Sequence, residues 1–224
     1  MKSTQNKKKS GTFSFQVKVF SYMLLILVVC ILNACKKDSI SPTPTPPVVV
    51  ENKDRVPDQP NIKYTKLNQL VTIGASDGLQ KTKIDLNGDG TFEVYAEIYR
   101  NNHELNLYFV TDINNSITAG SNNMAKCFST GTLLSASYQN WYNYGDMYKL
   151  ITNQQNEPIY ISSLTQNTDM YLGVKFVKDH NDYYGWIRFK FTVYTGASNA
   201  AIIEIKDCAY EQTQGYGIKT GNTF

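Results

Sequence analysis

The sequence has few of the residues from which catalytic sites are usually built. Its 224 residues include two histidines, His103 and His180, and four cysteines. No Gly-x-Ser-x-Gly elbow, HExxH pair, phosphate-binding loop or Cys–His arrangement is present. We therefore expect a protein that is not an enzyme. A polysaccharide-active hydrolase stays open as an alternative, because two catalytic carboxylates pair in space rather than in sequence. Its nominal candidates are Asp146 and Glu157.

The apolar run near the N-terminus is too short to cross a membrane. Five lysines precede the run from Val19 to Leu32, which is roughly 14 residues long, whereas a spanning helix needs about 20. A basic start, a short apolar region and a small residue before the cut indicate a secretory signal over residues 1–34. An uncleaved anchor helix is the alternative.

The tetrapeptide LNAC, which ends at Cys35, resembles the lipobox of bacterial lipoproteins. The resemblance implies that Cys35 carries diacylglycerol and becomes the new N-terminus. Such acyl chains hold a protein to a membrane surface. The expected location is therefore the bacterial outer membrane, on either the cell surface or the periplasmic face.

Without residues 1–34 the chain has no excess of basic residues. All 19 acidic residues follow Cys35, but only 17 of the 22 lysines and arginines do, which gives a net charge of −2. A near-neutral chain without basic clusters lacks the electrostatic footprint of a nucleic-acid-binding protein. Nucleic acid is therefore excluded as a partner.

Only two cysteines, Cys127 and Cys208, remain after Cys35. In an exported protein, two cysteines usually pair, so we predict a Cys127–Cys208 disulfide. The alternative is two small buried apolar residues that never meet. A nucleophilic cysteine would need a histidine partner and is disfavoured.

Six of the seven prolines fall between Pro42 and Pro60. Such density favours extended polyproline II, so residues 35–60 are predicted to be a stalk up to about 75 Å long. Residues 61–224 have the length of one domain.

Within residues 61–224 the apolar residues alternate with period two. The pattern is clear in Phe92–Tyr99, Leu105–Phe109 and Trp186–Val193, and no helical stripe extends beyond about two turns. Alternation predicts strands with one buried face. The expected fold is all-β: a single antiparallel β-sandwich or jelly-roll-like domain.

The stretch KIDLNGDGTFEVYAEI has the spacing of a calcium loop. Asp85, Asn87, Asp89, Thr91 and Glu93 occupy positions 1, 3, 5, 7 and 9, with Gly90 at position 6. Calcium binds six to eight hard oxygens, and alternate residues of a tight loop can supply them.

An EF-hand is disfavoured, because position 12 is Ala96 and the chain runs directly into a strand pattern rather than a helix. The loop instead resembles the D-x-[DN]-x-D-G-x-x-[DE] turns of extracellular β-proteins, which implies a structural Ca²⁺ site. A metal-free turn is the alternative, since Asn-Gly and Asp-Gly form turns by themselves.

Two further stretches are YYGWIRFKF at Tyr183–Phe191 and DCAYE at Asp207–Glu211. With the DLNGDG loop and the YLGVKF strand, they resemble a Bacteroidetes-type group of secreted bacterial lipoprotein domains. The resemblance implies an extracellular β-sandwich and carries no activity with it. From the residues, Gly185 suits a close approach between strands, and Arg188 is placed to pair with Asp207 or Glu211. A ligand-binding role for Trp186 and Arg188 is the alternative to packing.

The segment Tyr138–Tyr148 reads YQNWYNYGDMY and is the least strand-like and most aromatic part of the domain. Aromatic faces beside amides and carboxylates suit sugars and peptides, so the ligand-binding candidates are Trp141, Tyr142, Tyr144 and Asp146. A tyrosine-rich loop that packs on its own domain is the alternative. We therefore expect a module that binds a glycan or a protein partner, with an accessory envelope component that has no ligand of its own as the second possibility.

Overall fold

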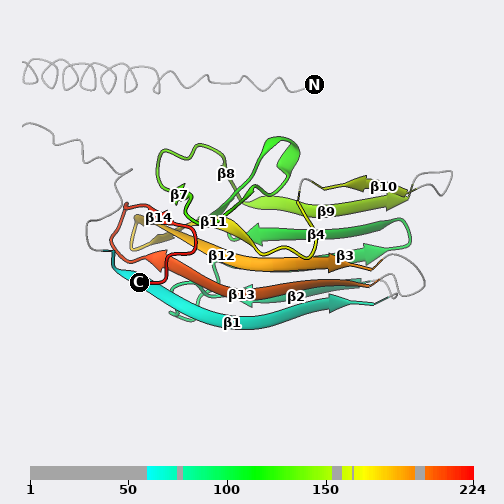
Figure 1. Cartoon of the computed structure of the whole chain (residues 1–224), viewed down its shortest axis with the longest axis horizontal. Coiled ribbons are helices and arrows are strands. Elements are labelled where there is room, and N and C mark those ends of the chain that lie inside the picture. The colour runs from blue at the N-terminus through cyan, green and yellow to red at the C-terminus, as the bar shows by residue number, and fades with distance from the viewer. Residues whose placement is uncertain (1–59, 75–77, 153–157, 163, 195–199) are drawn as a thin grey trace, which may run out of the picture. The chain divides into compact units, whose positions relative to one another are not determined.

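The computed structural model describes residues 60–74, 78–152, 158–162, 164–194 and 200–224 (Figure 1). The predicted signal over residues 1–34, the lipidated Cys35 and most of the stalk lie outside these ranges. Within them, no helix has both the length and the apolar character that a membrane crossing requires. Among the described residues, the one helical element is a short 3₁₀ segment at Ser121–Asn123.

The domain is an antiparallel β-sandwich, as the alternation predicts. The first layer is a seven-stranded sheet in the order β1-β13-β12-β11-β5-β8, with β6 also paired to β11. Its strands are β1 (Ile62–Ile73), β5 (Ser116–Thr118), β6 (Cys127–Phe128), β8 (Trp141–Tyr142), β11 (Met170–Lys178), β12 (Asn181–Val193) and β13 (Ala201–Glu211).

The second layer is a five-stranded sheet in the order β10-β9-β4-β3-β2. Its strands are β2 (Gly78–Ile84), β3 (Val94–Asn101), β4 (Glu104–Thr111), β9 (Tyr144–Thr152) and β10 (Pro158–Ile161). A small third sheet pairs β7 (Leu133–Leu134) with β14 (Ile218–Lys219).

The main core lies between the two large sheets and uses the predicted inward residues. On β3 and β4, alternate side chains such as Ile98 and Leu107 are fully buried. The ring of Phe109 on β4 packs edge-on against that of Phe189 on β12, with 4.9 Å between centroids. Burial of such apolar area is the main favourable term in folding, so these residues hold the layers together.

Two sequence predictions about strand limits are wrong. The strand predicted from Phe92 begins at Val94, because the loop before it extends to Glu93. The segment predicted to be a loop at Tyr138–Tyr148 instead contains β8 and the start of β9. A register shift opposite Leu107 and Tyr108 interrupts the alternation on β9, and such bulges disguise a strand in the sequence.

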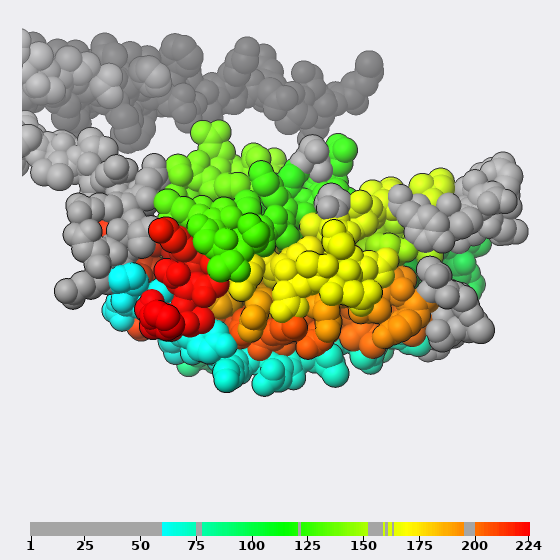
Figure 2. Space-filling model, in the orientation of Figure 1, coloured from blue at the N-terminus to red at the C-terminus, as the bar shows by residue number. Residues whose placement is uncertain are grey.

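The seven-stranded sheet has a second, smaller hydrophobic cluster on its outer face. Its buried members are Leu134, Tyr184, Trp186, Ala209 and Ile218. Leu134 and Ile218 come from the small β7–β14 sheet. Figure 2 shows the C-terminal residues, in red, beside the green segment at one end of this face. One end of the outer face is therefore covered, and we call these five residues the cover cluster.

Two predicted contacts of the C-terminal motifs are confirmed. A Cβ on Gly185 would lie 2.6 Å from the carbonyl oxygen of Ala209 and 3.1 Å from the Leu86 side chain, so only glycine fits there. Arg188 pairs with Asp207 across β12 and β13, with 2.9 Å between Nε and Oδ1. Glu211 instead accepts hydrogen bonds from the backbone N–H groups of Asn61 and Thr213.

Candidate functional site

The predicted calcium loop connects β2 to β3 and folds around its own acidic side chains. Asp85 accepts hydrogen bonds from the backbone N–H groups of Gly88 at 2.6 Å and Gly90 at 2.9 Å. Both glycines have positive φ, 68° and 90°, a conformation that glycine adopts without steric cost. The sequence spacing DLNGDG therefore produces a tight loop in which the first acid is fixed by backbone donors.

Glu93, the last residue before β3, closes the loop by accepting two hydrogen bonds from earlier loop residues. Its Oε2 accepts the Leu86 backbone N–H at 2.8 Å, and its Oε1 accepts the Asn87 side-chain N–H at 2.8 Å. The side chain is buried, at 3% exposure. Burial disfavours the charged form and raises the pKa of Glu93 to about 7, with the charges of Asp85 and Asp89 adding to the rise.

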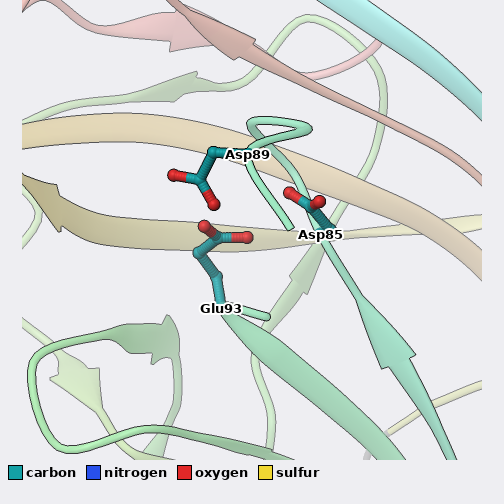
Figure 3. A group of neighbouring side chains, drawn as sticks. All are labelled: Asp85, Asp89 and Glu93. Carbon is teal, nitrogen blue, oxygen red and sulfur yellow. The ribbon is translucent and has the colours of Figure 1, made fainter. Parts of the chain in front are cut away.

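Three of the five predicted ligands come together as a carboxylate cluster. One oxygen each from Asp85, Asp89 and Glu93 lie within 4.8 Å of one another, and Figure 3 shows the three carboxylates around a common space. Two oxygens bound to one Ca²⁺ at 2.3–2.6 Å are at most about 5.2 Å apart. The spacing of the three oxygens therefore fits a single calcium ion.

Asn87 and Thr91 border this cluster. Asn87 accepts the Asp89 backbone N–H at 2.8 Å, and the Thr91 N–H donates to Asp89 at 2.8 Å. The second bond is the main reason that the pKa of Asp89 lies below its usual value. Lys63 from β1 donates to the Asn87 carbonyl. The loop is thus ordered by its own contacts and tied to the neighbouring sheet.

The predicted Cys127–Cys208 disulfide is wrong, and both thiols are free. Cys127 is opposite Leu172, Leu172 is opposite Ile187, and Ile187 is opposite Cys208. Three strand spacings of about 4.8 Å separate the cysteines by roughly 14 Å, whereas a disulfide needs Cα atoms about 4.4–6.8 Å apart. Both face the core, and burial raises the pKa of the Cys208 thiol to about 12. Cys208 acts as a small buried apolar residue, and Cys127 as a partly buried one that packs against the main core.

The four predicted ligand-binding residues are divided between the two sheets. Trp141 lies on β8 of the seven-stranded sheet and packs against the cover cluster. Its ring contacts Tyr138 and Tyr184 at centroid distances of 5.4 and 5.8 Å. Its neighbour Tyr142 is 46% exposed. The packed alternative thus describes Trp141 better than a ligand-binding role.

Tyr144 and Asp146 lie on β9, on the outer face of the five-stranded sheet. Tyr144 is opposite Val110, and Asp146 is opposite Tyr108. The Tyr144 hydroxyl donates to the Asp146 carboxylate. Tyr144 is half-buried and belongs to neither hydrophobic cluster. These two predicted residues therefore form a polar aromatic pair outside both hydrophobic clusters.

Three residues that the sequence did not single out complete this surface. Tyr108 packs against Tyr144 with 5.2 Å between ring centroids. Glu97 lies opposite Tyr108 on β3, and its carboxylate adds to the rise in the pKa of the Tyr108 hydroxyl. Asn106 donates to the Tyr144 hydroxyl at 3.1 Å. We call Glu97, Asn106, Tyr108, Tyr144 and Asp146 the tyrosine face.

The hydrogen bonding of the tyrosine face leaves one acceptor unused. Asn106 is 6% exposed, and its Oδ1 has no partner among the described residues. A buried polar atom without a partner costs about 1–3 kcal/mol. Burial and the nearby carboxylates raise the pKa values of Tyr108 and Tyr144, so both phenols stay neutral. In the sequence, only the outward parity of these residues on their strands pointed to this face.

Comparison with family models, curated proteins and solved structures gives no match for this chain.

Proposed function

We propose that this protein is an exported, lipid-anchored β-sandwich module that binds a glycan or a protein partner and has no catalytic activity of its own. The observation that supports the proposal is the tyrosine face, where two half-buried aromatic rings lie among amide and carboxylate groups on a face with no hydrophobic cluster. Binding sites typically combine apolar area with a few polar groups that fix orientation.

Export and anchoring are supported by the N-terminal sequence. The signal pattern and the lipobox ending at Cys35 indicate acylation, and the resemblance of the C-terminal motifs to secreted lipoprotein domains agrees with it. The parent chain should incorporate labelled fatty acid and lose residues 1–34, and the Cys35→Ala variant should do neither. A parent chain that keeps residues 1–34 and carries no fatty acid would argue for the uncleaved anchor instead.

The binding role is tested with the full chain, detergent-solubilised, on a glycan array and against envelope extract. Tyr144→Ala should abolish the signal, because Tyr144 lies on the tyrosine face. Trp141→Ala should lower stability but leave the bound fraction of folded protein unchanged, because the Trp141 ring packs against Tyr138 and Tyr184. If both variants bind as the parent does, the ligand does not use this face.

We further propose that the loop between β2 and β3 holds a structural Ca²⁺ through Asp85, Asn87, Asp89, Thr91 and Glu93. The spacing within the carboxylate cluster supports this, and the ion would supply positive charge that compensates the buried Glu93. With a Kd of about 10⁻⁴–10⁻³ M, as in extracellular modules, 10 mM calcium would stabilise the fold by about 1.4–2.7 kcal/mol. That raises the Tm by about 3–10 °C.

The calcium test compares melting in 10 mM calcium and in EDTA. The calcium-dependent rise in Tm should disappear in Asp85→Asn and Asp89→Asn variants and persist in Glu104→Gln, an acid of β4 that pairs with Lys149 away from the loop. Equal melting temperatures of the parent chain in calcium and EDTA would favour the metal-free turn.

A further inference from the structure

The outer face of the five-stranded sheet has apolar side chains over much of its area. Tyr95 and Tyr99 on β3 and Tyr108 on β4 have the parity opposite to that of the core residues of these strands, and all three are half-buried. At the two edges of the sheet, Leu79 on β2 and Ile159 on β10 are each 47% exposed. Among the described residues, no member of this face belongs to either hydrophobic cluster. Uncovered apolar area of this kind marks contact with another molecule.

The charges of this face lie in register across the strands. Lys81 on β2 lies opposite Glu97 on β3. Glu97 lies opposite Tyr108 on β4, and Tyr108 lies opposite Asp146 on β9. We call these four residues the middle row. It has a lysine at one end and an acid at the other, so its two ends match in charge when the row is reversed.

The row of side chains beside the middle row also matches its own reverse. Lys83 on β2 lies opposite Tyr95 on β3. Val110 on β4 lies opposite Tyr95 on one side and Tyr144 on the other. Reversal places the Lys83 ammonium against the Tyr144 ring and the Tyr95 ring against the aliphatic Val110. Both are favourable contacts, the first between a cation and an aromatic face and the second between apolar groups.

The two ends of the middle row have no ion pair among the described residues. The Lys81 side chain is exposed, and the Asp146 carboxylate accepts the hydroxyl of Tyr144. By contrast, Lys149 on the same face pairs with Glu104 at 2.9 Å. A basic and an acidic group at opposite sides of the face are therefore open to a partner.

A second copy of the chain fits this face when a two-fold axis runs along the strands between β3 and β4. The rotation brings each row against the same row of the other copy in reversed order, which makes the contact isologous. Lys81 of each copy then faces Asp146 of the other, and Tyr108 of each copy faces Glu97 of the other. An unrelated partner would give no reason for the face to match its own reverse.

The contact area is that of a weak dimer. The strands β2, β3, β4 and β9 are about 4.8 Å apart, and the eight residues of β4 extend about 27 Å, so the overlap covers roughly 500 Å² of each copy. Stable interfaces bury about 1,200–2,000 Å² in total, and this one lies just below that range. Anchoring of both copies to one membrane, as proposed above, would raise their effective concentration.

Resting on the protein-binding form of the function proposed above, we propose that the partner of this face is a second copy of the same chain. The two five-stranded sheets pack face to face, with Lys81 of each copy against Asp146 of the other and the tyrosine rings between them. The dimer covers the uncovered face of the sandwich and places its open charges in pairs.

The test is energy transfer between donor-labelled and acceptor-labelled full chains in detergent, measured as the chain concentration rises. Transfer in the parent should increase with concentration and fall when excess unlabelled chain is added. Lys81→Glu in both copies should weaken association about tenfold or more, because like charges then face each other. Asp146→Lys in both copies should do the same. The matched control is Lys219→Glu, an exposed lysine of β14 in the small sheet, which should associate as the parent does.

The decisive sample mixes the two variants. Lys81→Glu on one copy and Asp146→Lys on the other restore both pairs with their signs exchanged, so the mixture should associate within about threefold of the parent. The unfolding midpoint of each variant is measured alongside. Asp146→Asn in both copies keeps the shape of the side chain and should still weaken association, because the attraction to Lys81 is lost.

Several results would overturn this inference, and they separate it from the function on which it rests. A parent chain that stays monomeric would overturn the docking, and so would association that no charge change weakens or that folded mixed variants do not restore. If a monomeric chain still binds a glycan or an envelope protein through Tyr144, the function proposed above stands with another ligand. A chain that binds neither a second copy nor any other partner would overturn both proposals.

Discussion

The outer faces of the two sheets differ, although both are built from strands with outward-facing aromatic residues. On the seven-stranded sheet, Trp186 points outward and is nonetheless 1% exposed, because Leu134 and Ile218 of the small β7–β14 sheet cover it. On the five-stranded sheet, Tyr108 and Tyr144 point outward and stay half-buried, outside both hydrophobic clusters. An outward aromatic residue is thus a core residue in one case and a candidate binding residue in the other.

Strand parity assigns a side chain to one face of a sheet and does not say what lies above that face. The segments that cover Trp186 come from residues 133–134 and 218–219, far from β12 in the sequence. Three sets of substitutions test how strongly the covered and uncovered regions differ, and one further set tests the loop between β2 and β3.

The largest effect is expected at the covered face. Trp186→Ala removes a side chain whose ring contacts Tyr171 at 5.2 Å and Tyr64 at 6.3 Å between centroids. Truncating a buried tryptophan should cost about 3–5 kcal/mol of unfolding free energy. Tyr108→Ala on the uncovered face should cost about 1 kcal/mol. Urea unfolding measures both, and similar losses would mean that the two faces are equally packed.

A smaller effect is expected where the cover meets the sheet. A Cβ on Gly173 of β11 would lie 2.6 Å from Thr118 and 2.9 Å from the Leu134 side chain. Gly173→Ala should therefore cost about 1–3 kcal/mol through overpacking. Gly74→Ala, where a Cβ meets nothing within 4 Å, should change stability by less than about 0.5 kcal/mol. Equal midpoints for the two variants would show that the cover moves aside freely.

Glu93 provides a comparison inside the loop, away from both outer faces. Its pKa in the folded chain is raised to about 7 from 4.5, so between these values the folded state holds a proton that the unfolded state has lost. The unfolding free energy in EDTA should therefore fall as pH rises from 4.5 to 7, by on the order of 2 kcal/mol.

Glu93→Gln should remove that part of the pH dependence, and Glu104→Gln should keep it. The measurement is a series of urea unfolding curves from pH 4.5 to 8. If the Glu93→Gln and parent curves run parallel across this range, Glu93 does not titrate there. Calcium should restore the stability of the parent at pH 8, because the ion favours the ionised carboxylate.

The smallest effect on stability is expected at two ion pairs between β12 and β13. The side chain of Asp207 is 4% exposed and forms an ion pair with Arg188. It also accepts a hydrogen bond from the Tyr64 hydroxyl at 2.9 Å. Asp207→Asn should cost about 1.5 kcal/mol. Glu204 pairs with Lys190 at 2.8 Å but is 35% exposed, and Glu204→Gln should cost less than Asp207→Asn, because exposed ion pairs contribute little. High salt should reduce the Lys190–Glu204 contribution more, and equal salt sensitivity would contradict the difference in burial.

Part of the candidate site could be read from the sequence because it is local. Asp85, Asp89 and Glu93 lie within nine residues, so the spacing of the loop brings their carboxylates together. The Arg188–Asp207 contact could also be predicted from the sequence, since both residues lie in strand patterns with compatible parity. The tyrosine face was only half predicted: Tyr144 and Asp146 were named for their composition, but Glu97, Asn106 and Tyr108 come from two other strands whose register the sequence does not state.

The β class, the inward parity of the main core and the acidic loop could be predicted from the sequence, because each follows from spacing within a short segment. Only the packing of distant segments places Cys127 and Cys208 three strands apart, sets Trp141 against the cover cluster, and turns Tyr144 outward beside Tyr108. These outcomes depend on which distant strands become neighbours and which face receives a cover. Both are set by the packing of the whole chain, because a strand pattern specifies two faces and leaves their partners open.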